Sequence, residues 1–338
     1  MSEAAQLLDT LRNDGHVCDP NARIEPLLGG VSSEIYVVYD GAEKFVVKLA
    51  LAKLKVKDDW FADTVRNAAE CNYLECVGRI RPDIVPQIYF VEPEKGYFGM
   101  EFFGADFANW KQLLLSGDCR VEHAQMAGTI LAEIHQQTSG DHELRKKFDT
   151  TASFRQLRLD PYLRRTGDLH PELRDMFYSE AGRMENTHEA LVHGDFSPKN
   201  LLIKGDRMVV LDCEVAWYGD PAFDVAFLLS HLFLKSLHHA PVDYEFENMV
   251  SGFWRSYAAA RDEAGACTVE KRLGSLLLML LLARVDGKSP VEYLSPQKQQ
   301  LIRDFAVERL HQPPQSLGEL RKEWFQAVTT SQTIQANL

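Results

Sequence analysis

A chain of 338 residues, 45% hydrophobic and 25% charged, has the composition of a folded protein with room for two domains. Its formal charge of −12 excludes a general nucleic-acid-binding protein, which needs a basic surface, and slightly favours a cationic substrate. The six cysteines form no Cys-x-x-Cys pair, so a zinc site or disulfide framework is not expected and a reducing, cytoplasmic location is.

The first residues predict a short helix and no targeting signal. Leu7 and Leu11 lie on one helical face, Ser2 is a suitable N-cap and Gly15 a suitable stop. The segment lacks the basic and apolar regions of a signal peptide. The most apolar run, residues 276–283, is shorter than the roughly 20 residues that a membrane span requires. We therefore expect a buried helix there and no membrane association.

Residues 24–103 predict a small α+β unit. Alternating apolar residues over 24–50 indicate strands, with a turn at Asp40-Gly41. A helix is expected over residues 60–78, with Gly78 as its stop, followed by strands at 85–91 and 97–103.

Helical patterns dominate the rest of the chain. Apolar residues at helical spacing predict a long helix over residues 121–137. Three short strands with tight turns are expected at residues 190–192, 201–203 and 209–211. From residue 222 onward the pattern is again mostly helical.

The strongest chemical signal is the run His193-Gly-Asp-Phe-Ser-Pro-Lys-Asn200, followed by Asp212 after the next apolar strand. Phosphoryl transfer needs an acceptor hydroxyl held in line and a metal ion on the phosphates. Asp195 can accept the proton of the hydroxyl, while Asn200 and Asp212 offer the hard oxygen ligands that Mg²⁺ prefers. These three groups are the predicted catalytic residue and metal ligands.

This pattern resembles the aminoglycoside phosphotransferase and choline kinase-like families, whose catalytic loop reads H-G-D-x-x-x-x-N with an Asp after the following strand. The resemblance spans roughly residues 24–300. It implies a protein-kinase-like fold, ATP and Mg²⁺ as cofactors, and a small-molecule hydroxyl as acceptor. Gly194 replaces the Arg of the protein-kinase H-R-D loop, and Asp212-Cys213-Glu214 replaces D-F-G, which favours a small-molecule substrate.

The same resemblance implies a nucleotide site in the first part of the chain. Lys48 lies in an apolar strand and should contact the phosphates, held there by Glu70 of the following helix. The backbone around Glu101 and Phe103 matches the hinge that would bind adenine. Four residues match the bend that folds over the phosphates: Gly29, Gly30, Ser32 and Ser33.

A finer resemblance concerns residues 214–224, which are similar to a stretch of the methylthioribose kinase family. That family differs at Asn200, where it carries Ser. Methylthioribose is therefore one candidate acceptor. Glu214 shares one side of an extended segment with Asp212, so a role near the metal is open to it.

Three side-chain groups near this motif have simpler interpretations. His193 is expected to pack under the loop and hold its backbone, and Asp224 to cap or brace the helix that begins near Pro221. Four arginines, which could bind an anionic substrate or belong to a lid, are more simply a solvated helix face. They are Arg155, Arg158, Arg164 and Arg165.

Gly287-Lys288-Ser289 resembles part of a P-loop, but Leu282 stands where a P-loop needs another Gly, and a helix precedes it. Arg284, Asp286 and Lys288 are possible acceptor contacts, and a helix C-cap at Gly287 is an equally good interpretation.

The sequence thus predicts an α+β, protein-kinase-like two-lobe fold, with a nucleotide-binding lobe over residues 1–101 and a catalytic, substrate-binding lobe over 102–338. The expected activity is ATP-dependent phosphorylation of a small molecule such as an aminoglycoside, an amino alcohol or a modified sugar. A protein Ser/Thr kinase-like enzyme and a nucleotide-binding scaffold without turnover are the alternatives.

Overall fold

The computed structural model describes residues 2–27, 33–50, 66–242 and 245–336, and the chain forms two compact units. Unit 1 contains residues 1–107 and the short segment 211–214, and unit 2 contains residues 108–210 and 215–338. The predicted boundary between residues 101 and 102, with its division of roles between two lobes, stays a prediction.

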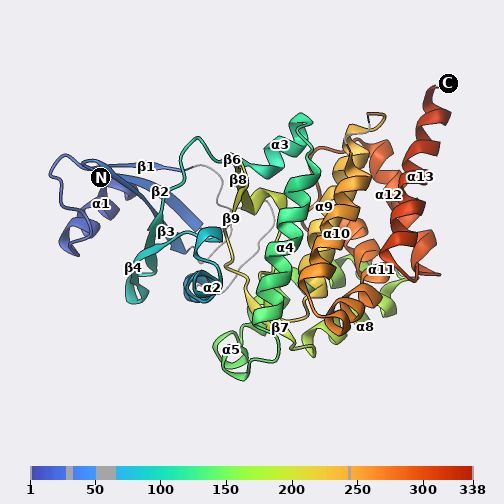
Figure 1. Ribbon diagram of the computed structural model, residues 1–338, viewed down its shortest axis with the longest axis horizontal. Coiled ribbons are helices and arrows are strands. Elements are labelled where there is room, and N and C mark those ends of the chain that lie inside the picture. Colours follow the sequence, from blue (N-terminus) through green and yellow to red (C-terminus); the bar gives the residue numbers. More distant parts are fainter. Residues whose placement is uncertain (1, 28–32, 51–65, 243–244, 337–338) are drawn as a thin grey trace. The chain divides into compact units, whose positions relative to one another are not determined.

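Unit 1, which includes the blue strands in Figure 1, is built on a five-stranded antiparallel sheet. Its strands lie in the order β1-β2-β3-β5-β4. Its strands are β1 (Arg23–Pro26), β2 (Ser33–Asp40), β3 (Glu43–Ala50), β4 (Ile88–Glu92) and β5 (Tyr97–Glu101). Its helices are α1 (Glu3–Asn13), α2 (Arg66–Ile80) and the short 3₁₀ turns η1 (Pro82–Ile84) and η2 (Pro93–Lys95). The predicted strands and the Ser2 N-cap are confirmed, since Ser2 accepts a hydrogen bond from Ala5.

The two helices of unit 1 contact the sheet through different residues. Leu7 and Leu11 of α1 pack with Val38 and Val47 in one apolar cluster. Side chains alternate along a strand, so Lys48 points to the face opposite Val47. The helix α2 packs against β3 and β5 and runs to Ile80, past the stop expected at Gly78.

Unit 2 is mainly helical, with two small sheets, β7-β10 and β6-β8-β9. Its strands are β6 (Ala108–Asn109), β7 (Ala190–Val192), β8 (Leu201–Lys204), β9 (Arg207–Val210) and β10 (Trp217–Gly219). Helices before β7 are α3 (Trp110–Ser116), α4 (Val121–Gln137), α5 (His142–Lys147), α6 (Thr151–Phe154), the π-helix η3 (Arg155–Arg164), α7 (Arg165–Leu169) and α8 (Arg174–Glu185). Helices after it are the 3₁₀ turn η4 (Pro198–Asn200), α9 (Ala222–His239), α10 (Phe246–Ala260), α11 (Glu263–Asp286), α12 (Pro296–Leu310) and α13 (Leu317–Ala336).

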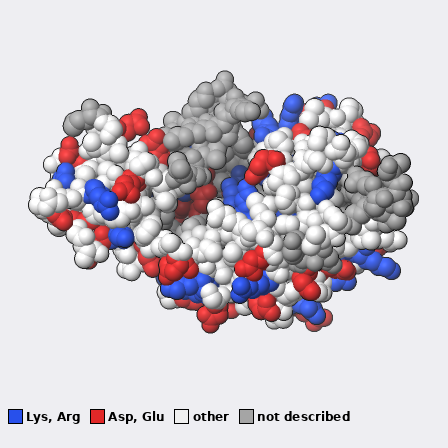
Figure 2. All heavy atoms as spheres, turned by 90° about the horizontal axis from the view of Figure 1, so that it is seen from above, with Lys and Arg blue, Asp and Glu red and all other residues white. Residues whose placement is uncertain are grey.

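The core of unit 2 gathers around α4, α9, α10 and α11 (Figure 1); α10 packs against the other three, and α9 also packs against α11. The apolar run of residues 276–283 is buried within α11, as predicted. Every helix in the described ranges is too short or too polar to span a bilayer. On the face shown in Figure 2, acidic and basic side chains are interspersed and form no single basic surface.

Gly128 sets how closely α4 and α10 approach each other. A Cβ at this position would lie 2.3 Å from the carbonyl oxygen of Phe253. We expect Gly128→Ala to destabilise the protein by about 1–3 kcal/mol, because the helices must move apart. The matched control is Gly182→Ala in α8, where no atom lies within 4 Å, and it should be neutral or stabilise by up to about 1 kcal/mol. Urea denaturation of both variants measures the difference, and equal midpoints would contradict the prediction.

Candidate functional site

Lys48 is the centre of a buried charged group in unit 1. Its side chain is 2% exposed, and it lies in β3, where apolar side chains flank it. Its Nζ lies 2.7 Å from Oε2 of Glu70 in α2 and 2.5 Å from Oδ1 of Asp212. A lysine in an apolar strand was expected to need a partner. Glu70, the predicted partner, pairs with Lys48.

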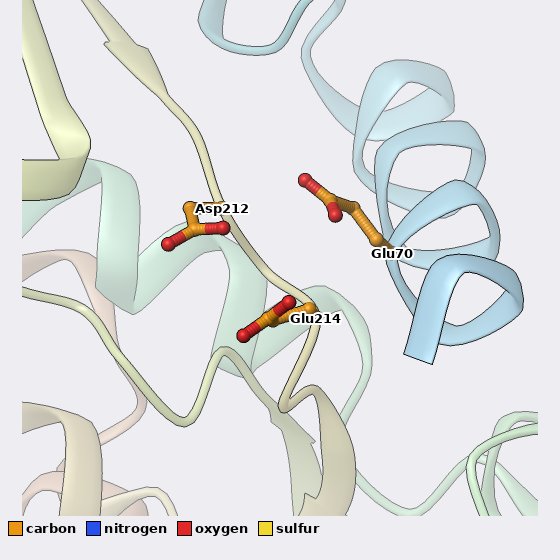
Figure 3. A group of neighbouring side chains, drawn as sticks. All are labelled: Glu70, Asp212 and Glu214. Atoms are coloured by element: carbon orange, nitrogen blue, oxygen red, sulfur yellow. The ribbon is translucent and has the colours of Figure 1, made fainter. Parts of the chain in front are cut away.

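The segment 211–214 supplies two carboxylates to this group (Figure 3). Asp212 has a left-handed backbone, with φ at +60°, a conformation in which Asp is one of the better-tolerated residues. Cys213 donates a hydrogen bond from Sγ to the Glu70 carbonyl at 3.7 Å. Arg66 contacts Oε1 of Glu214 at 3.3 Å. The strained backbone therefore presents Asp212 and Glu214 beside α2.

The charges of this group shift one another's pKa values. Burial alone would lower the pKa of Lys48, but Asp212, Glu70 and Glu214 outweigh it and raise the pKa well above the ordinary value. Burial, with the charges of Asp212 and Glu214, raises the pKa of Glu70 to about 7 despite Lys48. Lys48 is therefore a permanent cation among carboxylates.

Ligand atoms of Glu70, Asp212 and Glu214 lie within 4.8 Å of one another, and in Figure 3 Glu70 points from its helix toward the segment that carries the other two. All three offer carboxylate oxygens, the donor type that suits Mg²⁺. The donor set therefore fits a hard divalent cation. Of the three, Asp212 was predicted as a ligand, and Glu214 was named only as open to such a role.

The loop over residues 193–200 lies in unit 2 and follows β7. Gly194 has φ at +77°, and a Cβ there would lie 2.6 Å from the carbonyl oxygen of Val215, so no other residue fits this position. His193 is fully buried, and its Nδ1 accepts a hydrogen bond from the backbone of Asp195 at 3.1 Å. The prediction that His193 holds the loop backbone is confirmed.

Asp224 holds the same loop from the first turn of α9. Its carboxylate accepts hydrogen bonds from the backbone N–H groups of His193 at 2.7 Å and Gly194 at 2.9 Å. Asp224 was expected to cap or brace its own helix; it does not cap α9, and its carboxylate braces this loop instead. The N-cap residue of α9 is Pro221, and the N–H of Ala222 in the first turn donates to Oδ1 of Asp220 at 2.9 Å.

Asp195 is largely buried and contacts two cations of unit 2. Its Oδ2 lies 3.2 Å from Arg158 Nη2 and 2.9 Å from Lys199 Nζ. Asn200 follows in η4 and donates from Nδ2 to the carbonyl of Asp195 at 3.0 Å. Asp195 and Asn200 are thus neighbours in one loop, as the motif predicted, while Lys199 was not predicted to contact Asp195.

Arg158 is the main residue that the sequence interpretation misplaced. The arginine-rich segment was expected to be a solvated helix face, yet Arg158 is 7% exposed and donates from Nε to the carbonyl of Gly194. Arg155 and Arg164 behave as expected of surface residues, since both pair with Glu185. The signal that could have separated Arg158 is its position between two leucines, Leu157 and Leu159.

Other predicted residues are placed as follows. Glu101 ends β5 and its N–H donates to the carbonyl of Gln87 at 2.8 Å, while the ring of Phe103 contacts that of Phe107. Ser33 begins β2. The remaining residues of the expected phosphate bend lie outside the described ranges: Gly29, Gly30 and Ser32.

The predicted helix C-cap at the end of α11 is confirmed, while acceptor contacts of Arg284 and Lys288 stay a prediction. Gly287 is the C-cap of the helix, and its N–H donates to Ala283. Asp286 pairs with Arg303 at 2.8 Å and with His170 at 2.9 Å, so it has a structural role.

Comparison with known proteins shows which family this chain resembles. The phosphotransferase enzyme family model matches residues 23–266. Methylthioribose kinase from Erwinia tasmaniensis is 24% identical over 262 residues, covering 69% of this chain and 65% of that protein. Methylthioribose kinase 1 of Oryza sativa subsp. japonica is 24% identical over 235 residues, covering 59% and 53%. The chain thus spans less than two thirds of the length of these relatives.

Solved structures show the same fold at low identity. An amicoumacin kinase in complex with AMP-PNP, Ca²⁺ and Ami aligns with a TM-score of 0.59 and 14% identity, over 94% of this chain and 98% of that one. Plasmodium vivax ethanolamine kinase aligns with a TM-score of 0.55 and 12% identity, over 92% and 96%. The predicted protein-kinase-like α+β fold is confirmed.

Proposed function

The chain belongs to the phosphotransferase enzyme family, and from this premise we propose that it transfers the γ-phosphate of ATP to a hydroxyl group of a small molecule. The observation that carries the proposal is the buried group of Lys48, Glu70 and Asp212. A lysine fixed by two carboxylates is positioned to bind phosphate oxygens, and a carboxylate on a strained segment beside it suits a metal ion.

In the proposed reaction, Asp195 orients the acceptor hydroxyl and takes its proton. A bond forms between the acceptor oxygen and the γ-phosphorus, the bond from that phosphorus to the oxygen of ADP breaks, and ADP leaves. Lys48 binds the phosphates and Glu70 holds Lys48. We assign Asn200 and Asp212 as the ligands that would hold Mg²⁺, which would supply positive charge against the phosphates.

The remaining assignments rest on the family resemblance. The bend over the phosphates is assigned to Gly29, Gly30, Ser32 and Ser33, and adenine contacts to the backbone of Glu101 and Phe103. We place the reaction in the cytoplasm, because all six cysteines are free thiols, as expected of a reducing compartment. Methylthioribose, an aminoglycoside and an amino alcohol are the acceptors that the resemblance brings forward.

Nucleotide binding and phosphate transfer test this function separately. ATP with Mg²⁺ should raise the melting temperature of the purified chain, and EDTA should cancel most of the increase. Transfer is then measured as ADP release and product mass with a library of small alcohols. Stabilisation without transfer to any alcohol would favour the scaffold, transfer to protein serines would favour a protein kinase, and the absence of stabilisation would contradict nucleotide binding itself.

A further inference from the structure

Unit 2 contains a buried lysine, Lys235, that forms no ion pair with any described residue. Lys235 in α9 is 1% exposed, and within the described ranges its ammonium group has neither an ion pair nor a hydrogen bond. Its Nζ lies over the ring of Tyr293, 5.3 Å from the ring centroid. Lysine is almost never buried unless it is paired, because an uncompensated charge is costly to remove from water. A partner from outside the chain would remove this cost.

Two neighbouring groups also have unused hydrogen-bonding capacity. The hydroxyl of Tyr293 is buried without a hydrogen-bond partner, and so is Nε of Arg284. Arg284 donates from Nη1 to the hydroxyl of Tyr162 at 3.2 Å and to Oγ of Ser289 at 2.9 Å. These are neutral acceptors, and Arg284 makes no ion pair with a carboxylate within the described part of the chain.

Several positively charged side chains surround Lys235. Burial, reinforced by the charges of Lys111 and Arg284 and opposed by Glu292, lowers the pKa of Lys235 to about 7. One turn earlier, burial and four cations, among them Lys235, lower the pKa of His231 well below its ordinary value. His231 is therefore neutral and offers its ring nitrogens as further polar groups.

This region is continuous with Asp195 through direct contacts. Lys199 and Arg158 both contact the Asp195 carboxylate. Arg158 lies 5.9 Å from the centroid of the Tyr162 ring, and Arg284 approaches the same ring at 5.9 Å and hydrogen-bonds its hydroxyl. The proposed base and the unpaired charges therefore belong to one group of side chains in unit 2.

Positive charge exceeds negative charge in this group, which we call the cationic cluster. Its basic members are Lys111, Arg158, Lys199, Lys235 and Arg284. Lys111 pairs with Glu292, and Arg158 and Lys199 pair with Asp195, whereas Lys235 and Arg284 have no ion pair in the described part of the chain. The side chain of Lys199 is 48% exposed and that of Lys111 is 32% exposed, so the cluster reaches the solvent.

We propose that the acceptor carries an anionic group, a carboxylate or a phosphate, which Lys235 binds together with Arg284 and the Tyr293 hydroxyl while the reacting hydroxyl faces Asp195. The inference rests on the proposed phosphotransfer and specifies its substrate class. A cationic acceptor would be repelled by the cluster, and a neutral one would leave Lys235 unpaired. The overall charge of −12 slightly favoured a cationic substrate, whereas the positive charge of the cationic cluster favours an anionic one.

Acceptors matched in size and different in charge test this selectivity. One series is glucose, gluconate, glucose phosphate and glucosamine, and a shorter one is glycerol, glycerate, glycerol phosphate and aminopropanediol. Transfer should be at least tenfold more efficient, as kcat/KM, for an anionic member than for its neutral and cationic counterparts. Comparison of the acids with the phosphate esters identifies which anion the site takes. A preferred amino sugar or neutral sugar would overturn the inference and leave the proposed phosphotransfer intact.

Lys235→Met tests the residue itself. We expect the KM of the anionic acceptor to rise about 10- to 100-fold, the loss typical of a hydrogen bond to a charged group, while the KM of ATP stays unchanged. Lys271→Met is the matched control, because Lys271 is exposed on α11. An unchanged KM for the anionic acceptor would overturn the assignment of Lys235.

Thermal stability, which needs no catalytic turnover, tests the anion site independently of the proposed phosphotransfer. Lys235→Met should raise the melting temperature of the free protein, because it removes an unpaired buried charge, whereas a structural lysine would give a decrease. Inorganic phosphate and gluconate should stabilise the wild type more than the variant. Equal stabilisation of both would contradict the anion site. If ATP and Mg²⁺ fail to stabilise the wild type, the proposed phosphotransfer fails, whatever the anions do.

Discussion

Asp195→Asn is expected to lower kcat by about 10²- to 10⁴-fold with little change in the affinity for ATP. The amide has nearly the same shape as the carboxylate but does not accept the proton of the acceptor hydroxyl. The backbone N–H of residue 195 would keep its hydrogen bond to His193, so the loop should stay in place. Steady-state kinetics with the best acceptor measures the effect, and an ATP thermal shift shows that the nucleotide still binds.

The control for Asp195→Asn removes a carboxylate from unit 2 that does not belong to the loop over residues 193–200. Asp160 lies in η3 with a half-exposed side chain that pairs with Arg164. Asp160→Asn should therefore change kcat by less than about twofold, since an exposed ion pair contributes little. A kcat for Asp195→Asn within a few-fold of wild type would contradict the role of Asp195 as base.

Asp212→Asn is expected to be at least as damaging as the loss of the proposed base, because it removes the proposed metal ligand and a partner of Lys48. Asn tolerates the left-handed backbone at this position, so the fold should be retained. We expect a fall in kcat of about 10²- to 10⁴-fold and a higher Mg²⁺ concentration for half-maximal activity. Titration of activity with Mg²⁺, followed by Mn²⁺, measures both.

Glu214→Gln provides the comparison for the metal assignment. Glu214 contacts Arg66 and belongs to the same group of carboxylates, but it was not assigned to the metal. A smaller effect than that of Asp212→Asn is expected. An unchanged Mg²⁺ dependence in Asp212→Asn would remove Asp212 from the metal site.

The predicted fold and the unit 1 site followed from patterns that are local in sequence. Lys48 in an apolar strand required a partner, and the following helix offered Glu70 at a suitable position. The hairpin turn at Asp40-Gly41 and the antiparallel pairing of β2 and β3 followed from alternating apolar residues and a turn dipeptide.

The misplaced residues depend on tertiary structure. Arg158 lies in a π-helix, whose wider turn does not follow the 3.6-residue period used to predict which face is solvated. Gly78 does not end α2, because packing of the helix overrides the low helix propensity of glycine. Lys235 carried no signal of its own, since a lysine in a helical sequence is ordinarily solvent-exposed.

The first turn of α9 holds the loop over residues 193–200 through Asp224, and later turns of the same helix carry His231 and Lys235. The offsets of seven and eleven residues correspond to two and three turns, so the three side chains share one face. The backbone positions of Asp224 and Lys235 are thus separated by about 16 Å along one continuous helix. Because one helix fixes this separation, the enzyme should discriminate among acceptors of equal charge by the distance between their reacting hydroxyl and their anionic group.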